Sequence, residues 1–292
     1  MRLVRYNGGR IGLVKGNDVF DVSKIVGAGQ GDWPSVEMNR LIRNFAMLRP
    51  QIENLAASVK PEPLTSVKLE TPVPWPNKLM AYPVNYHDHA KEMKSTGFAN
   101  VQGYFLKASS SLCGAGDQVV LPKLVNREIH HECELAVVIG KEGRNISTEN
   151  ALDYVFGYAC LMDMTIRGKE ERVFRKSYDT FTPVGPWIVT ADEVGDPTQL
   201  DMKLWINGEL RQHANTRDLI VGIREMIALA STASTLYPGD LIATGTPAGV
   251  GPMAAGDTVT IEIEKVGRMS LPVVQGDIGT NFVFDRNVQE PV

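Results

Sequence analysis

The sequence predicts a β-rich α+β fold in which a small N-terminal α/β domain precedes a larger catalytic domain. Most apolar residues of the second half fall in short runs of strand length bounded by Gly, Pro and Asn, and few stretches have helical spacing. Five prolines between Pro61 and Pro76 indicate an extended linker. We therefore expect domains at residues 1–70 and 71–292, a size that can bury a substantial core.

The N-terminal domain is expected to combine short strands with one helical region. Its first thirty residues alternate β-like runs with turn signals at 7–9 and 16–18. Apolar residues spaced three and four apart between Leu41 and Leu55 predict the helical region. Pro50 lies inside this pattern and is expected to break or kink the helix.

The larger domain is expected to contain several strands and two helices. Helices are predicted at Tyr86–Lys94 and Leu219–Leu236, and Asn207-Gly208 predicts a hairpin turn within Met202–Leu210. The remaining predicted strands are Tyr104–Lys107, Cys133–Ile139, Val155–Met162, Trp187–Thr190, Leu241–Ala243, Thr258–Glu264 and Met269–Val274.

Composition argues against several classes of protein. With 22% charged residues, a formal net charge of -4 and a pI of about 5.8, the chain is not expected to bind nucleic acid or an anionic membrane. The N-terminus lacks the apolar core of a signal peptide, and no segment reaches the length of a membrane span. The three cysteines form no CxxC pair. We expect a cytoplasmic protein.

Two glutamates begin the apolar run His130–Gly140. Because strand side chains alternate between faces, Glu132 and Glu134 point the same way, and two adjacent anions on so apolar a strand favour a cation between them. Asp163 ends a second apolar run. These three oxygen ligands suit Mg²⁺, Mn²⁺ or Ca²⁺ and leave positions for water and substrate. The alternative is a solvated strand face, on which Glu-x-Glu pairs are common.

A second candidate site lies in the polar helix expected after Asn85. His89 and Glu92 are i,i+3 neighbours, so the carboxylate can orient the imidazole as a general base for water. The alternative is an ordinary exposed pair near a helix start. His130 and His131 are not expected to be ligands, since His131 points away from the glutamates.

Two further segments are candidates for substrate contact. The charged run 167–180 follows Asp163 directly and is rich in Arg and Lys. It is either a solvated surface or a lid that recognises an anionic substrate. The glycine-rich segment 239–251 lacks the spacing of a P-loop or a dinucleotide fingerprint, so it predicts a turn that lines a pocket.

In this order the motifs resemble the fumarylacetoacetate hydrolase family over roughly residues 78–285. The matching pieces are Asn-Tyr-x-x-His-x-x-Glu at 85–92, His-x-Glu-x-Glu-Leu-Ala-Val-Val-Ile-Gly at 130–140, Gly-Tyr-x-x-x-x-Asp at 157–163, Lys-Ser-Tyr-Asp-Thr-Phe-x-Pro at 176–183 and Gly-Asp-x-Ile-Ala-Thr-Gly-Thr-Pro-Ala-Gly-Val-Gly at 239–251. The resemblance implies a mixed β-sandwich or roll catalytic domain that forms a homodimer.

The resemblance also implies roles for individual residues. Glu132, Glu134 and Asp163 would bind Mg²⁺ or Mn²⁺, with Ca²⁺ as a substitute in vitro. His89, Glu92 and Lys176 would be catalytic. Thr246 would contact a substrate carboxylate, and Tyr86 would also contact substrate.

Two motifs depart from the family pattern. Pro83-Val84 replaces a Gly-Arg pair, and 167–170 replaces Arg-Asp-x-Gln. Substrate recognition is therefore assigned to Arg167, Lys169 or Arg172.

The predicted function is metal-dependent hydrolysis of a carbon–carbon bond in a small anionic 1,3-diketo acid, such as an acylpyruvate or a 2,4-diketo acid, in a catabolic role. Decarboxylation of a β-keto acid such as oxaloacetate, or a hydroxymuconate-type isomerisation, would use the same metal site and remain alternatives. A non-catalytic scaffold stapled by a metal is a third possibility. Such a staple needs only the carboxylates, whereas this chain also has His89, Glu92, Lys176 and Thr246.

Overall fold

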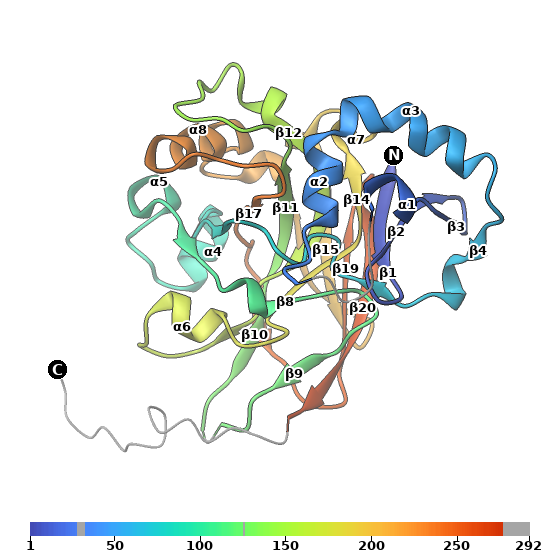
Figure 1. The fold of residues 1–292 in the computed structure, drawn as a ribbon. Helices are drawn as coiled ribbons and strands as arrows, with labels where there is room; N and C mark the ends of the chain where they lie inside the picture. Colours follow the sequence, from blue (N-terminus) through green and yellow to red (C-terminus); the bar gives the residue numbers. More distant parts are fainter. Residues whose placement is uncertain (28–32, 125, 277–292) are drawn as a thin grey trace.

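The computed structural model describes residues 1–27, 33–124 and 126–276, and the last residues of the expected resemblance, 277–285, lie outside this range. Its centre is a large mixed sheet in which strands of the N-terminal segment continue the sheet of the larger domain (Figure 1). In sheet order the strands are β4 (Glu62–Pro63), β3 (Asp18–Asp21), β2 (Arg10–Lys15), β1 (Arg2–Tyr6), β14 (Thr182–Thr190), β12 (Val155–Met162), β11 (Cys133–Ile139), β17 (Leu241–Ala243), β6 (Leu79–Ala81) and β7 (Phe105–Leu106). Two short strands join from the side, β5 (Leu69–Glu70) on β1 and β8 (Leu112–Cys113) on β14.

Two smaller sheets complete the β structure. One has the order β16 (Glu209–Asn215), β15 (Asp201–Ile206), β19 (Thr258–Ile263), β20 (Gly267–Gln275) and β9 (Val119–Leu121). The other consists of β13 (Thr165–Ile166), β10 (Ile129–His131) and β18 (Gly251–Pro252). The five-stranded sheet packs on β11, β12 and β14, so the core of the larger domain is a β-sandwich.

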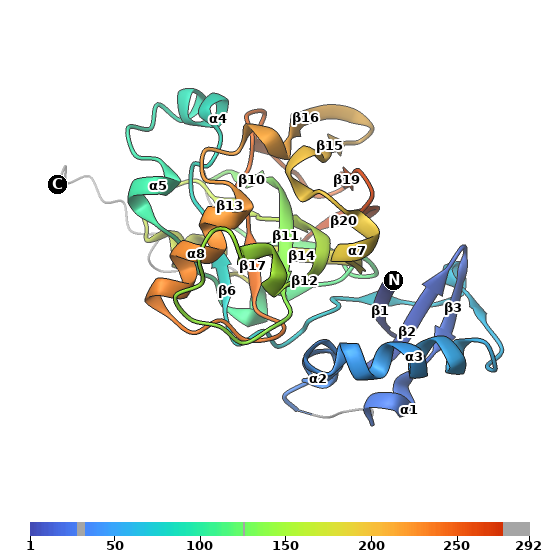
Figure 2. The ribbon, with the colours of Figure 1, turned by 90° about the horizontal axis from the view of Figure 1, so that it is seen from above.

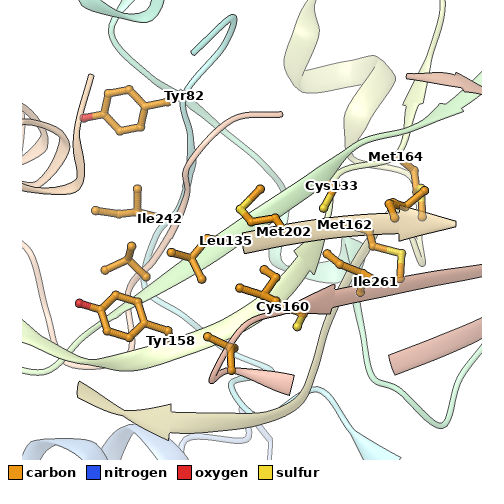
Figure 3. Packing of buried hydrophobic residues seen from close by; sticks show 14 of the residues in the cluster. Tyr82, Cys133, Leu135, Tyr158, Cys160, Met162, Met164, Met202, Ile242 and Ile261 are labelled. Atoms are coloured by element: carbon orange, nitrogen blue, oxygen red, sulfur yellow. The ribbon is translucent and has the colours of Figure 1, made fainter. Parts of the chain in front are cut away.

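The core between the two sheets is built by alternate residues of the central strands. Leu135 of β11 and Cys160 of β12 face Met202 and Ile261 of the second sheet (Figure 3). The opposite face of the same strands carries small residues, including Ala136, and is the face on which Glu134 lies. The small side chains leave room for charged residues beside the sheet.

Helices cover the remaining surfaces of the sheets. They are α1 (Ser23–Val26), α2 (Glu37–Arg43), α3 (Phe45–Ala56), α4 (His87–Glu92), α5 (Ala99–Gln102), α6 (Arg172–Lys176), α7 (Ala191–Val194) and α8 (Ile223–Ala233). Figure 2 shows α1–α3 grouped with β1–β3, to one side of the strands β11, β12 and β17. No helix in the described part of the chain combines the length and apolar character that a membrane crossing needs.

The predicted β-rich α+β class is confirmed, and several strands have the predicted bounds, among them β11, β12 and β17. Two helix predictions were wrong in detail. Helix α3 continues through Pro50, its sixth residue, and the break lies at Asn44, between α2 and α3. Helix α8 begins at Ile223 rather than Leu219, because the side chain of Asn85 binds the backbone of Val221 and holds this stretch extended.

The proline-rich segment is part of the N-terminal sheet. Its residues form β4 and β5, which pair with β3 and β1. Strand β1 in turn pairs with β14, with Leu3 opposite Ile188. The two segments on either side of the expected boundary are therefore joined by a continuous hydrogen-bonded sheet.

Candidate active site

Three carboxylates meet at one end of the central strands, on the small-residue face of the sheet. Glu134 lies on β11, Glu132 occupies the junction of β10 and β11, and Asp163 directly follows β12. The backbone N–H of Asp163 donates to the carbonyl of Glu132 at 3.0 Å, which fixes the two strand ends together. One oxygen of each carboxylate lies within 4.8 Å of the others, and all three residues are buried.

Two buried lysines neutralise part of this charge. The Lys176 ammonium donates to Glu132 Oε2 and to Asp163 Oδ2, both at 2.6 Å. Lys107 pairs with the other Asp163 oxygen and donates to the Phe181 carbonyl at 3.2 Å. Glu134 accepts a hydrogen bond from the N–H of Gly245 at 2.7 Å, and no lysine among the described residues is bonded to it.

The electrostatics of the two glutamates differ accordingly. Burial raises the pKa of Glu134 well above its usual range, and the neighbouring Asp163 and Glu132 raise it further. Burial acts in the same direction on Glu132, but Lys176 and Arg167 outweigh it and lower the pKa of Glu132 to about 2. Burial would lower the pKa of Lys176, yet the adjacent carboxylates raise it, so this lysine is an ammonium.

This donor set fits a hard divalent cation. Three buried carboxylates converge, one of them without a paired side-chain cation, and such a site is relieved by a metal ion. Carboxylate oxygens favour Mg²⁺, Mn²⁺ or Ca²⁺ over softer metals. Glu132, Glu134 and Asp163 are therefore the residues that would hold the metal.

His89 and Glu92 form a hydrogen-bonded pair on helix α4. His89 Nδ1 lies 2.9 Å from Glu92 Oε2, and the other Glu92 oxygen accepts from the N–H of Gly249 at 3.0 Å. Because an ionised carboxylate only accepts hydrogen bonds, Nδ1 carries the imidazole proton and Nε2 keeps a free lone pair. The pair can therefore act as a general base.

The three carboxylates, His89 and Lys176 line one cavity of about 220 Å³. Thr246 also lines it, together with the basic residues Arg167, Arg172 and Arg175 at and before α6, which form its basic wall. The cavity lining includes His89, Phe105, Glu132, Glu134, Asp163, Arg167, Arg172, Arg175, Lys176 and Thr246. The structure thus brings together residues that are up to 157 positions apart in the sequence, from His89 to Thr246.

The basic wall has unused hydrogen-bond donors. Arg167 lies 3.7 Å from Glu132 Oε1, but its buried Nε and Nη2 make no hydrogen bond among the described residues. Arg175 donates through Nη1 to Thr165 Oγ1 at 2.7 Å, and its buried Nε is also without a partner in that part of the chain. Arg172 donates to the Gln102 side chain and lies over the ring of Phe105.

Two residues expected to contact the substrate do not line this cavity. Tyr86 is 1% exposed, and its hydroxyl lies 4.0 Å from the sulfur of Met202 in the core. It directly precedes α4, so its side chain turns inward while that of His89 faces the cavity. Lys169 lies in an exposed bend after Arg167.

Sequence reasoning missed two charged residues of the site. Lys107 ends the predicted strand Tyr104–Lys107, and its burial becomes evident only with its ion pair to Asp163, because lysine is rarely fully buried unless paired. Arg175 lay within the charged run 167–180 but was not singled out. Helical spacing places it beside Arg172 on the short helix α6.

The chain is similar to known proteins over nearly its whole length. Residues 78–274 match the family model "Fumarylacetoacetate (FAA) hydrolase C-terminal". Maleylpyruvate hydrolase of Aquipseudomonas alcaligenes is 43% identical over 285 residues, which cover 94% of this chain and 99% of that protein. Human mitochondrial oxaloacetate tautomerase FAHD2B is 35% identical over 285 residues, 91% of this chain and 90% of that protein.

A solved structure is similar to the same extent. The crystal structure of maleylpyruvate hydrolase from Sphingobium sp. SYK-6, in complex with manganese(II) ion and pyruvate, has a TM-score of 0.88 at 55% sequence identity. The match covers 95% of this chain and all of that chain.

Proposed function

Since the chain belongs to the fumarylacetoacetate hydrolase family, as its motifs indicated, we propose that it hydrolyses the carbon–carbon bond of a 2,4-diketo acid that carries a second carboxylate. The observation that carries the proposal is the His89–Glu92 pair, of which His89 lines the same cavity as the three carboxylates. Hydrolysis needs a base for water beside the metal, whereas metal-dependent decarboxylation does not.

The reaction follows from what each side chain can donate or accept. A divalent cation held by Glu132, Glu134 and Asp163 would act as a Lewis acid toward the 2-oxo acid end of the substrate. His89 Nε2 takes a proton from water, whose oxygen bonds to the C4 carbonyl carbon, and Glu92 stabilises the resulting imidazolium.

Lys176 acts at the bond that breaks. When the C3–C4 bond breaks, its electron pair becomes the enolate of pyruvate, and protonation at C3 completes pyruvate and a second carboxylic acid. Two of the three ammonium N–H groups of Lys176 donate to Glu132 and Asp163, so the third can donate to the developing enolate oxygen. The products are two smaller acids.

The arginines of the basic wall indicate that the substrate carries a second carboxylate. Among the described residues, Arg172 and Arg175 form hydrogen bonds only to neutral groups, and Arg175 has an unpaired buried Nε. Guanidinium groups pair preferentially with carboxylates, often through two parallel hydrogen bonds. Two of the similar proteins are maleylpyruvate hydrolases. Maleylpyruvate is a 2,4-diketo acid with a second carboxylate at its far end.

Kinetics on two substrates test the proposal. Maleylpyruvate and acetylpyruvate share the 2,4-diketo acid end, but only the first has a distal carboxylate. Arg175→Gln should lower kcat/KM for maleylpyruvate by about 10- to 100-fold, the value of one charged hydrogen bond, and leave acetylpyruvate nearly unchanged. Lys169→Gln is the matched control, because this exposed cation does not line the cavity.

Two results would contradict the proposal. Equal losses on both substrates would refute the distal-carboxylate contact. If the wild-type protein released no pyruvate from either diketo acid but converted oxaloacetate, the alternative chemistry would be correct, and the similarity to an oxaloacetate tautomerase gives that assay its substrate.

We also propose Mg²⁺ or Mn²⁺ as the bound cation, supported by the all-carboxylate ligand set and by the manganese(II) ion in the Sphingobium structure. A homodimer, a cytoplasmic location and a catabolic role extend the same proposal. Light scattering of the purified protein tests the dimer.

A further inference from the structure

Gln212 does not line the cavity, but it links the strand that bears Glu132 and Glu134 to the loop that bears Thr246. It belongs to β16, where its neighbours Arg211 and His213 are exposed while its own side chain is 1% exposed. Its amide reaches the backbone at Cys133, between the two metal-binding glutamates, and also the side chain of Thr246. No sequence motif had singled it out.

All four hydrogen-bonding positions of this amide are used. Oε1 accepts from the Cys133 N–H at 3.0 Å and lies 3.1 Å from His131 Nδ1, while Nε2 donates to Thr246 Oγ1 at 2.8 Å and to the Pro247 carbonyl at 2.9 Å. Because a backbone N–H can only donate and a carbonyl can only accept, these two backbone partners fix which end of the amide is oxygen.

This orientation determines the role of the Thr246 hydroxyl. Since Nε2 only donates, Thr246 Oγ1 accepts from it, and the hydroxyl proton is left to point elsewhere. Thr246 lines the cavity, so its proton is available to a ligand that only accepts hydrogen bonds. A carboxylate is such a ligand.

We propose that Gln212 is a positioning residue that holds the Thr246 hydroxyl as a hydrogen-bond donor to the carboxylate of the 2-oxo acid, and that ties this loop to the strand bearing Glu132 and Glu134. The inference rests on the proposed function, because it takes the substrate to be a 2-oxo acid whose carboxylate Thr246 contacts, the role that the family resemblance implies for this threonine. The amide acts through Thr246 and does not touch the reacting atoms.

Gln212→Glu separates the two halves of this role. A carboxylate keeps the acceptor for the Cys133 N–H but cannot donate, so Thr246 would turn its proton toward residue 212 and away from the ligand. The measurement is calorimetric titration of pyruvate into manganese-loaded protein, together with the Mn²⁺ affinity of the metal-free protein. Gln212→Glu should bind pyruvate about 10- to 100-fold more weakly and keep its Mn²⁺ affinity.

Four further variants complete the experiment. Thr246→Val removes the same donor and should cause the same loss, and the double variant should bind pyruvate no more weakly than either single variant. Gln275→Glu is the matched control, because Gln275 also donates to a carbonyl, that of Leu121, but lines another pocket and not this cavity. If Gln212→Glu does not fold, Gln212→Met should weaken pyruvate binding as well and also lower the Mn²⁺ affinity.

The outcomes distinguish the inference from the function on which it rests. If Thr246→Val binds pyruvate more weakly but Gln212→Glu binds it with wild-type affinity, the inference alone is overturned. The same holds for Gln212→Met if that variant is used. Additive losses in the double variant would also overturn it, since the two residues would then act separately. Wild-type pyruvate affinity in Thr246→Val would refute the Thr246 contact of the proposed function and the inference together.

Discussion

Replacing the two glutamates of the Glu-x-Glu pair by glutamine should have opposite effects on the stability of the metal-free protein. Glu132 accepts a charged hydrogen bond from Lys176 at 2.6 Å, whereas Glu134 accepts only the N–H of Gly245 and faces two other carboxylates. Glu132→Gln therefore removes an attraction, and Glu134→Gln removes repulsion. Both variants should lose metal affinity, since each removes a charged ligand.

The sizes follow from the geometry. Two negative charges 4.8 Å apart repel by about 3.5 kcal/mol at an effective dielectric constant of about 20. Protonating a carboxyl at pH 7 avoids this repulsion at a cost of at most about 3.4 kcal/mol, given a pKa of 4.5 in the unfolded chain. Glu134→Gln should therefore raise the free energy of unfolding by up to about 3 kcal/mol, and Glu132→Gln should lower it by about 2 kcal/mol.

The two effects also depend on pH in opposite ways. The pKa of Glu134 is raised in the folded protein. The loss in free energy of unfolding that Glu134 causes in the wild-type protein is therefore absent below pH 4.5 and grows as the pH rises. The pKa of Glu132 is lowered in the folded protein, so its stabilisation is present above pH 4.5 and is lost as the pH falls. Near pH 4.5 the advantage of Glu134→Gln should therefore disappear.

Urea unfolding with EDTA at pH 5 and pH 7, followed by tryptophan fluorescence, measures these free energies. Titration with Mn²⁺ then measures the metal affinity of the same variants. A change of the same sign in both variants at pH 7 would refute the electrostatic argument. Unaltered Mn²⁺ affinity in either variant would refute its assignment as a ligand.

Three other perturbations test separate parts of the site. His89→Ala should keep Mn²⁺ affinity while kcat falls by about 10²- to 10⁴-fold in a pyruvate-release assay, and a loss of metal would contradict its role as a base. Gly249→Ala should lower kcat and Tm, because its φ is +94° and the new Cβ would lie 2.1 Å from the Arg211 carbonyl oxygen, which displaces the N–H that binds Glu92. Gly208→Ala is its control, with positive φ but nothing within 4 Å, and equal kcat losses would argue against the clash. Removing metal with EDTA should abolish turnover, and Mn²⁺ at about 100 times its Kd should restore it and add about 2.7 kcal/mol of stability, whereas turnover that persists in EDTA would exclude an essential metal.

The elements that the sequence predicts best are those whose environment is uniform along the chain. Strands β11 and β12 are buried on both faces, so their continuous apolar runs mark both ends. Strand β14 begins at Thr182, five residues before the predicted Trp187, because Pro183 and Pro186 weaken the strand pattern at its start. The start of α8 depends on Asn85, more than 130 residues away, and no local pattern contains that contact.

The same distinction applies to the site. Alternation along one strand was enough to place Glu132 and Glu134 on one side, because that relation is local. The sequence does not predict the roles of Lys107 and Gln212, because their partners, Asp163 and Thr246, come from distant segments. A buried lysine or glutamine is recognisable only once the groups that satisfy it are known.

The glycine-rich segment 239–251 shows how a loop can couple functions that the sequence presents as separate motifs. Its backbone N–H groups bind Glu134 through Gly245 and Glu92 through Gly249, and between them Thr246 faces the cavity. The candidate metal ligand, the candidate general-base pair and the candidate substrate contact thus all meet five consecutive residues, 245 to 249. Gly245 and Gly249 both have positive φ, so a side chain at either position would strain the loop and shift more than one of these groups. Two glycines of this segment thus position the carboxylates of Glu134 and Glu92 through their backbone N–H groups.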